Sequence, residues 1–150
     1  MSLESALTDR YALWHQVLCD LFGYEAATPT RPPRTRNELA FRAVRPARGR
    51  IQPVGVDIRE TWLPGADPDL GITLHDCFLF SASWHAQVAP DAGPTGAERL
   101  DVERDKPAEL VVHRHPLGEP NDVRQPAAPL RHPQAWVTAV EEAIAAYYGY

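Results

Sequence analysis

Two histidines on one predicted strand form the clearest group of residues that could do chemistry. His113 and His115 are two positions apart, so on a strand they point to the same side with their Cα atoms roughly 7 Å apart. Glu119 follows four residues later and adds a carboxylate. Neutral imidazoles and a carboxylate placed in this way can hold a divalent transition metal and leave coordination positions open. The group predicts a metal site. The alternative interpretation is a solvated strand end that runs into a turn.

The spacing of these residues resembles the HxH…E half of the first cupin motif, which implies a bound divalent metal. The resemblance covers residues 113–119 alone. Pro107 and Pro126 stand where the cupin pattern has glycines, and the PxG…H of the second motif does not follow. A predicted C-terminal helix also occupies the space that cupin strands would need.

A second group lies on the segment from Ile72 to Val88, which we predict to be one strand with an apolar face and a polar face. His75 and Cys77 share the polar face and suggest a thiolate activated by an imidazole, against the alternative of a buried thiol beside a surface histidine. His85 shares this face too, but ten residues of strand place it ~33 Å from His75. Either histidine, His75 or His85, would extend the metal site if its strand lies beside that of His113.

Arginines dominate residues 31–50, which carry seven of them against the single acid Glu38, in a chain whose net charge is −5. Clustered arginines can grip phosphates, but the rest of the chain is acidic and its aromatic residues show no nucleic-acid-binding signature. We therefore expect an acidic protein partner or a solvated arm rather than nucleic acid. The arginines assigned to this contact are Arg31, Arg34, Arg36, Arg48 and Arg50.

Three tyrosines, Tyr147, Tyr148 and Tyr150, crowd the last four positions of the sequence. Complete burial is hard to achieve there, and exposed aromatic side chains are favoured at interfaces. The tyrosines therefore favour a protein partner or a second copy of the chain.

Helices are predicted at both ends of the sequence, because apolar residues recur there every three or four positions. The first helix places Arg10 off its apolar stripe, which comprises Leu3, Leu7, Tyr11, Trp14, Leu18 and Leu21. The second begins at Pro133, a residue suited to the first helical position, and places Glu141 in water. Its buried stripe comprises Trp136, Val140, Ile144 and Tyr147.

Between the helices the apolar period changes to two, which indicates strands. The alternation predicts strands over 38–43, 54–62, 72–88, 100–104 and 110–115, of which 100–104 is charged and resembles an edge strand. The four tryptophans fall on the apolar positions of these elements and are predicted to lie in the core. The fold class is therefore α+β, with an antiparallel sheet of about five strands packed against an N-terminal and a C-terminal helix.

Length and composition are typical of one globular domain over residues 1–150, with 44% hydrophobic and 23% charged residues. No apolar stretch approaches the ~20 residues that cross a bilayer, and the first residues do not have the pattern of a secretory signal. We therefore expect a cytoplasmic protein that is not bound to a membrane.

No motif in the sequence identifies a reaction. Ser81 and Ser83 have no G-x-S-x-G turn around them, and the glycines do not form a phosphate-binding loop. The function we expect is a non-enzymatic protein-interaction module without a cofactor, which binds a protein partner or further copies of itself. The layout resembles small acidic adaptor, chaperone, immunity or assembly proteins. The alternative is a small metal-dependent enzyme that uses His113, His115 and Glu119, with His75.

Overall fold

The fold belongs to the α+β class, as the sequence predicts, with two helices flanking an antiparallel sheet. The computed structural model describes residues 3–26, 37–66, 72–89, 97–105, 109–119, 124–127 and 132–149. Helix α1 (Leu3–His15) continues as a π-helical segment η1 (Gln16–Leu21), and helix α2 spans Pro133–Tyr148. The strands are β1 (Glu25–Ala26), β2 (Glu38–Arg45), β3 (Val54–Pro64), β4 (Thr73–Leu74), β5 (Cys77–Val88), β6 (Glu98–Asp105), β7 (Glu109–His115) and β8 (Gln125–Pro126).

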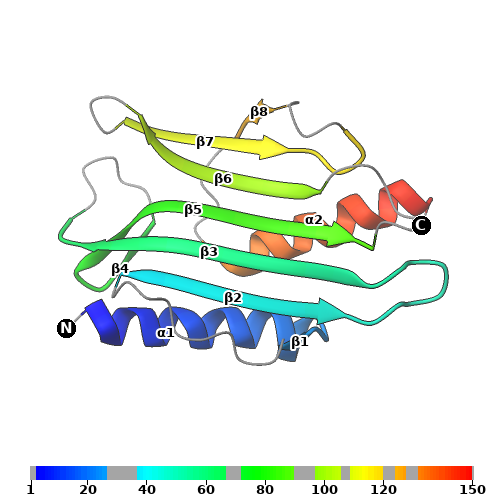
Figure 1. Ribbon diagram of the computed structural model, residues 1–150, viewed down its shortest axis with the longest axis horizontal. Helices are drawn as coiled ribbons and strands as arrows, with labels where there is room; N and C mark the ends of the chain where they lie inside the picture. Colours follow the sequence, from blue (N-terminus) through cyan, green and yellow to red (C-terminus); the bar gives the residue numbers. More distant parts are fainter. Residues whose placement is uncertain are drawn as a thin grey trace.

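Every strand pairs antiparallel with its neighbours in an eight-stranded sheet of order β1-β2-β3-β5-β6-β7-β8, and β4 pairs with β5 outside this path. The five long strands are those predicted, and the three additional strands have two residues each. In Figure 1, β2 and α1 lie toward one edge of the sheet, and β7 and β8 lie at the other. Strand β6 is internal rather than an edge strand, because it pairs with β5 on one side and with β7 on the other. Leu100 and Val102 face the core.

The segment 72–88 is not one straight strand. His75 and Asp76 form a tight turn, with His75 at a positive φ of 55°, so β4 folds back onto the start of β5. A β-bulge opposite Thr61 and Trp62 then inserts one extra residue, Phe80. Because a bulge reverses which face each residue occupies, Cys77 and Leu79 are buried, although the simple alternation predicts Phe78 and Phe80 there.

Both helices pack on the same face of the sheet. Trp14 of α1 and Trp136 of α2 each stack edge-to-face on Trp84 of β5, with ring centroids 5.1 and 5.8 Å away. The four tryptophans are all buried, as predicted. The opposite face is not covered by any helix or strand of the described residues, and we call it the open face.

Helix α1 is rotated relative to the predicted stripe. Tyr11 and Leu21 are exposed (47% and 55%), although the spacing predicts both to be buried. The buried positions of α1 and η1 are Ala6, Arg10, Trp14, Val17 and Leu18. The physical reason is twofold: Arg10 turns inward to a buried partner, and the wider π-helical turn changes the phase of the residues after His15.

Helix α2 begins at Pro133, as its sequence predicts. The His132 side chain accepts a hydrogen bond from the backbone of Gln134, Pro133 occupies the first turn, and Gly149 ends the helix in the left-handed conformation. Trp136, Val140 and Ile144 are buried as expected, whereas Tyr147 is 52% exposed.

Candidate functional site

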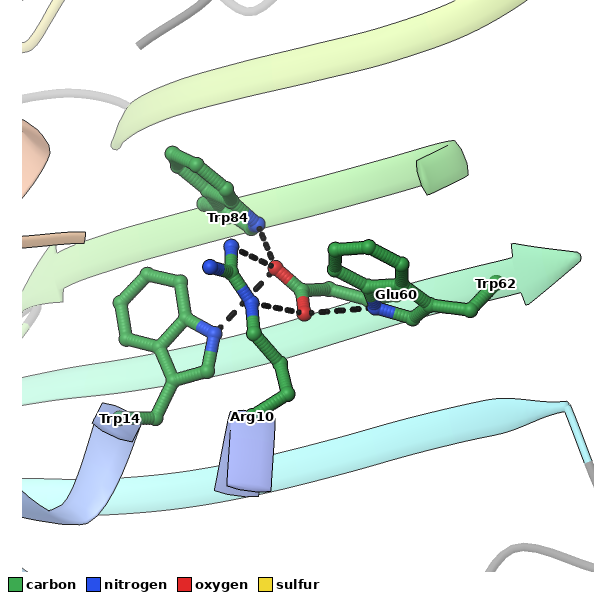
Figure 2. A network of polar contacts seen from close by, with 5 residues as sticks. All are labelled: Arg10, Trp14, Glu60, Trp62 and Trp84. Carbon is green, nitrogen blue, oxygen red and sulfur yellow. Dashed lines mark hydrogen bonds and ion pairs between the residues drawn. The ribbon is translucent and has the colours of Figure 1, made fainter. Parts of the chain in front are cut away.

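A buried carboxylate holds α1 against the sheet on the covered face. Glu60 of β3 accepts five hydrogen bonds, two from the Arg10 guanidinium at 2.9 Å and three from indole nitrogens. The indoles are those of Trp14, Trp62 and Trp84, at 3.2, 3.1 and 2.9 Å. Figure 2 shows the five side chains converging from α1, β3 and β5. Every lone-pair direction of the carboxylate is used, so the charge is satisfied in the core.

The same indoles also surround the cation. The Arg10 guanidinium carbon lies 5.2–5.9 Å from the ring centroids of Trp14, Trp62 and Trp84, within the range of cation–π attraction. The helical spacing places Arg10 off the apolar stripe of the helix, which is wrong, because the arginine lies on the buried side and is 4% exposed. The signal that could have found the pair is Glu60 itself, which occupies an inward position in the alternation of β3.

A second inward ion pair holds α2 to the edge of the sheet. Arg45 of β2 is buried and contacts the Glu141 carboxylate, which also accepts a hydrogen bond from the Tyr24 hydroxyl at 3.0 Å. Burial, followed by the Glu141 charge, raises the pKa of the Tyr24 phenol above its ordinary value. Glu141 is therefore half-buried and paired, although the sequence predicts it in water.

The open face carries its polar residues in rows that run across the strands. One row reads Arg42, Asp57, His85, Arg99 and His115 from β2 to β7. The next row reads Ala40, Arg59, Ser83, Asp101 and His113. In these two rows the charges on β3 and β6 alternate in sign both along each strand and across β5, and Glu103 adds a second acid after Asp101 on β6. The sequence shows that these residues point outward, but the rows depend on the strand order.

A hollow of about 440 Å³ lies in this open face. Its floor is β5, where Ser81 and Ser83 are small. Longer side chains on the flanking strands make its walls, and they are Glu38, Arg59, Arg99, Asp101 and Glu103. The hollow exists because short residues on a central strand lie between long charged residues on its neighbours.

The walls of the hollow are braced by ion pairs. Arg99 donates to Asp101 at 3.0 Å and approaches the Nε2 atom of His115 at 2.9 Å, while Asp101 lies 3.2 Å from the same nitrogen. The Nε2 atom can accept a hydrogen bond from Arg99 only when it carries no proton, and it can donate one to Asp101 only when it carries a proton. It therefore forms a hydrogen bond with one of these two neighbours at a time. His115 is 6% exposed, and its burial restricts the motion of its ring and of the two side chains that it contacts.

His85 lies between the walls, in the row that joins Asp57 to Arg99. Burial lowers the pKa of its imidazole. The carboxylates of Asp57 and Asp101 oppose this shift, and the Arg99 charge adds to it. The lowered pKa favours a neutral ring at neutral pH.

The residues of the metal hypothesis do not all come together. His113 and His115 share the open face of β7, and Glu119 lies exposed in the turn that follows. His75 lies in the β4–β5 turn, where its Nε2 atom is 3.0 Å from Asp9 of α1. His85 shares the open face, but β6 separates its strand from β7. Within the described residues, no three His, Cys, Asp or Glu side chains form a metal-binding group. The metal site stays a prediction, which elemental analysis of the purified chain with His113→Ala as its control would test.

The pair of His75 and Cys77 is divided by the geometry of the turn. Cys77 is buried in the core at 2% exposure, while His75 is partly exposed and contacts Asp9. This arrangement corresponds to the buried-thiol alternative.

The arginines and tyrosines predicted to bind a partner are only partly described. Arg31, Arg34, Arg36 and Tyr150 lie outside the described residues. Arg48 and Arg50 are exposed in the β2–β3 connection, and the Arg48 guanidinium donates to the Phe22 carbonyl at 3.1 Å. Tyr147 and Tyr148 stack edge-to-face with ring centroids 5.4 Å apart, and Tyr148 packs against the core.

Among the described residues, no helix combines the length and apolar character needed to span a bilayer. Comparisons with models of protein families, with curated proteins and with solved structures found no match for the chain.

Proposed function

We propose that the chain is a protein-interaction module that binds the charged surface of a folded protein through its open face. The observation that supports this proposal is the alternation of charge in two rows of the open face, where β3 carries Asp57 and Arg59 and β6 carries Arg99 and Asp101. Both helices pack on the other face, so neither helix covers this part of the sheet.

The chemistry of the face favours a protein over other ligands. Sites for small molecules are concave and mostly apolar, whereas this hollow combines hydroxyls and charged side chains with a few apolar residues such as Ala40 and Ala82. Nucleic acid favours a surface of uniformly positive charge, whereas acids here interrupt the arginines. Alternating charges favour a partner with the reversed pattern, and such complementarity provides register and specificity.

The arrangement also limits the entropic cost of binding. The side chains stand on hydrogen-bonded strands, and the Arg99–Asp101 pair is formed before any partner arrives. Binding therefore orders few further side chains, and each side chain held in advance reduces the conformational cost of association.

Site-specific photo-crosslinking tests the proposal. A photoreactive phenylalanine analogue placed at Ala40, on the rim of the hollow, should give a covalent adduct of one discrete mass in the cells that naturally make the chain. The same analogue at Glu142, which is exposed on α2, serves as the control. Absence of an adduct at Ala40, or the same adduct at both positions, would contradict the proposal.

A further inference from the structure

The open face is complementary to itself. We infer that its partner is a second copy of the chain, related to the first by a two-fold axis that runs along β5. This inference rests on the proposed function, and it identifies the partner that binds the same face.

The complementarity arises from the order of charges on the two strands beside β5. Strand β3 presents Asp57 and then Arg59, and in the same two rows β6 presents Arg99 and then Asp101. The sequence of signs on one side of β5 is therefore the reverse of the sequence on the other side.

A two-fold axis parallel to β5 makes each β3 face the β6 of the other copy, because the rotation exchanges the two sides of the central strand. Residues stay in their rows under this operation. Asp57 then meets Arg99 of the second copy, and Arg59 meets Asp101 of the second copy. Symmetry repeats both contacts, so four pairs of opposite charge form and none of these residues meets a like charge.

Strand β5 lies on the axis, so each of its outward residues faces its own copy. This position requires side chains that are small or uncharged, and β5 supplies Ser81, Ser83 and the neutral form of His85. A lysine or glutamate there would meet the same charge across the axis. Because the serines on the axis are short, the charged side chains on the flanking strands of the two copies can come into contact, with the two hollows facing each other.

The size of the face suits a dimer of moderate strength. Five strands spaced about 4.8 Å apart, with about eight residues of about 3.3 Å each, make a patch roughly 25 Å on a side. Such a patch approaches, without exceeding, the ~800 Å² per partner of a typical specific complex. Because the patch is polar and of moderate size, we expect a dimer of moderate affinity that dissociates when the chain is diluted.

Charge exchange between two variants tests the inference on the purified full-length chain. Arg59→Asp alone places a new carboxylate against Asp101 at both contacts, and Asp101→Arg alone places arginine against arginine. Each variant should dissociate at least about tenfold more readily than the wild type, because like charges that meet across an interface cost several kcal/mol. A one-to-one mixture of the two variants places opposite charges at both contacts, so it should form a heterodimer.

Sedimentation equilibrium of each variant and of the mixture measures this pattern. Asp57→Arg mixed with Arg99→Asp is an independent second exchange, which tests the neighbouring row. Glu142→Arg makes the same charge change as Asp101→Arg on α2 and should leave dimerisation unchanged. Circular dichroism and thermal midpoints establish that each variant is folded.

Three results would overturn the second copy as the partner. They are a wild-type chain that stays monomeric at all concentrations, mixtures that associate no better than the single variants, and a Glu142→Arg variant that dissociates equally. An adduct at Ala40 with a different folded protein would also overturn it while leaving the proposed function intact. No adduct at Ala40 would contradict both.

Discussion

Arg59 and Glu60 are neighbours on β3, yet they lie in opposite environments. The Glu60 carboxylate is buried among five donors on the covered face, whereas the Arg59 side chain is 66% exposed on the open face and lies 3.6 Å from Asp57. Both residues are charged, and they are one peptide bond apart. What separates them is which side of the sheet the helices cover.

The comparison shows how one strand can carry two kinds of charge. A buried ion pair must satisfy all its hydrogen bonds within the chain, because no water can replace a lost partner. An exposed charge on the open face, such as Arg59, keeps part of its hydration and can exchange water for a second protein. The covered face therefore fixes the position of α1, and the open face remains able to bind.

The largest effect is expected from breaking the buried pair. Glu60→Gln should lower the free energy of unfolding by about 3–5 kcal/mol, because it leaves the Arg10 cation without its anion. The new amide nitrogen would also face at least two donors, whichever oxygen it replaces. Urea denaturation followed by tryptophan fluorescence measures the loss.

A double-mutant cycle sharpens this prediction. Arg10→Met combined with Glu60→Gln should cost less than the sum of the two single variants, because the double variant leaves no unpaired charge. If the single variants do not fold, Trp84→Phe removes one donor and should cost about 1.5–3 kcal/mol. Trp136→Phe is the matched control, since Trp136 packs on Trp14 and Trp84 but is not among the donors to Glu60. Equal losses from the two tryptophan variants would contradict a special role for the carboxylate.

The second effect concerns the ion pair at the edge of the covered face. Glu141→Gln should cost about 2 kcal/mol, within the range for hydrogen bonds to charged groups, because buried Arg45 loses its anion. The loss should be smaller than for Glu60, since Glu141 is partly exposed and the Arg45 guanidinium also stacks over the Tyr24 ring at 5.7 Å. Thermal unfolding of both variants under the same conditions compares the two losses.

Tyr24 adds a dependence on alkaline pH to this pair. Its pKa is raised in the folded chain, so the unfolded chain ionises first, near the ordinary value of 10.0. The stability contributed by the neutral phenol is therefore complete below pH 10 and is lost as the pH rises toward the folded pKa. Unfolding measured between pH 9 and 11 should show this decline in the wild type and a smaller decline in Tyr24→Phe. Identical profiles would contradict the assignment.

The sequence predicts the elements better than it predicts their charged contacts. Helix α2 and the long strands follow from apolar periods and from the start signal Pro133, because burial imposes these periods directly. Arg10 and Phe80 could not be placed in this way. Burial of the Arg10 cation is unfavourable unless Glu60 lies opposite it, and local spacing does not show that pairing. A single bulge also reverses the face of every residue that precedes it on the strand. The rows of the open face need the pairing of β3, β5 and β6, which no local period contains.

A further prediction concerns His85, which lies on the two-fold axis of the inferred dimer. Burial lowers the pKa of its imidazole, so the ring is neutral at neutral pH and gains a proton only as the pH falls below its ordinary value of 6.5. Protonation would then place two positive charges against each other across the axis. Dimerisation should therefore weaken as the pH decreases from 7 to 5, as measured by sedimentation equilibrium.

Substitution of His85 separates this effect from the charged and ionisable side chains around it, which are Asp57, Arg99, Asp101 and, further along the row, His115. His85→Gln keeps a neutral polar side chain at every pH, so its dimer should lose much of the acid sensitivity. An equally acid-sensitive His85→Gln dimer would show that the titrating group lies elsewhere on the face.

The smallest effect on the fold should come from Arg59, the neighbour of Glu60. Arg59→Ala should change the free energy of unfolding of the monomer by no more than about 0.5 kcal/mol, because the side chain is exposed and its ion pair with Asp57 is screened by water. The measurement uses chain concentrations low enough for the monomer to predominate. The same variant should weaken the dimer, since each interface loses two opposite-charge contacts. If Arg59→Ala instead destabilised the monomer as strongly as Glu60→Gln does, side chains on both faces of β3 would contribute equally to the stability of the fold. The separation between a covered face that holds the helices and an open face that binds would then be wrong.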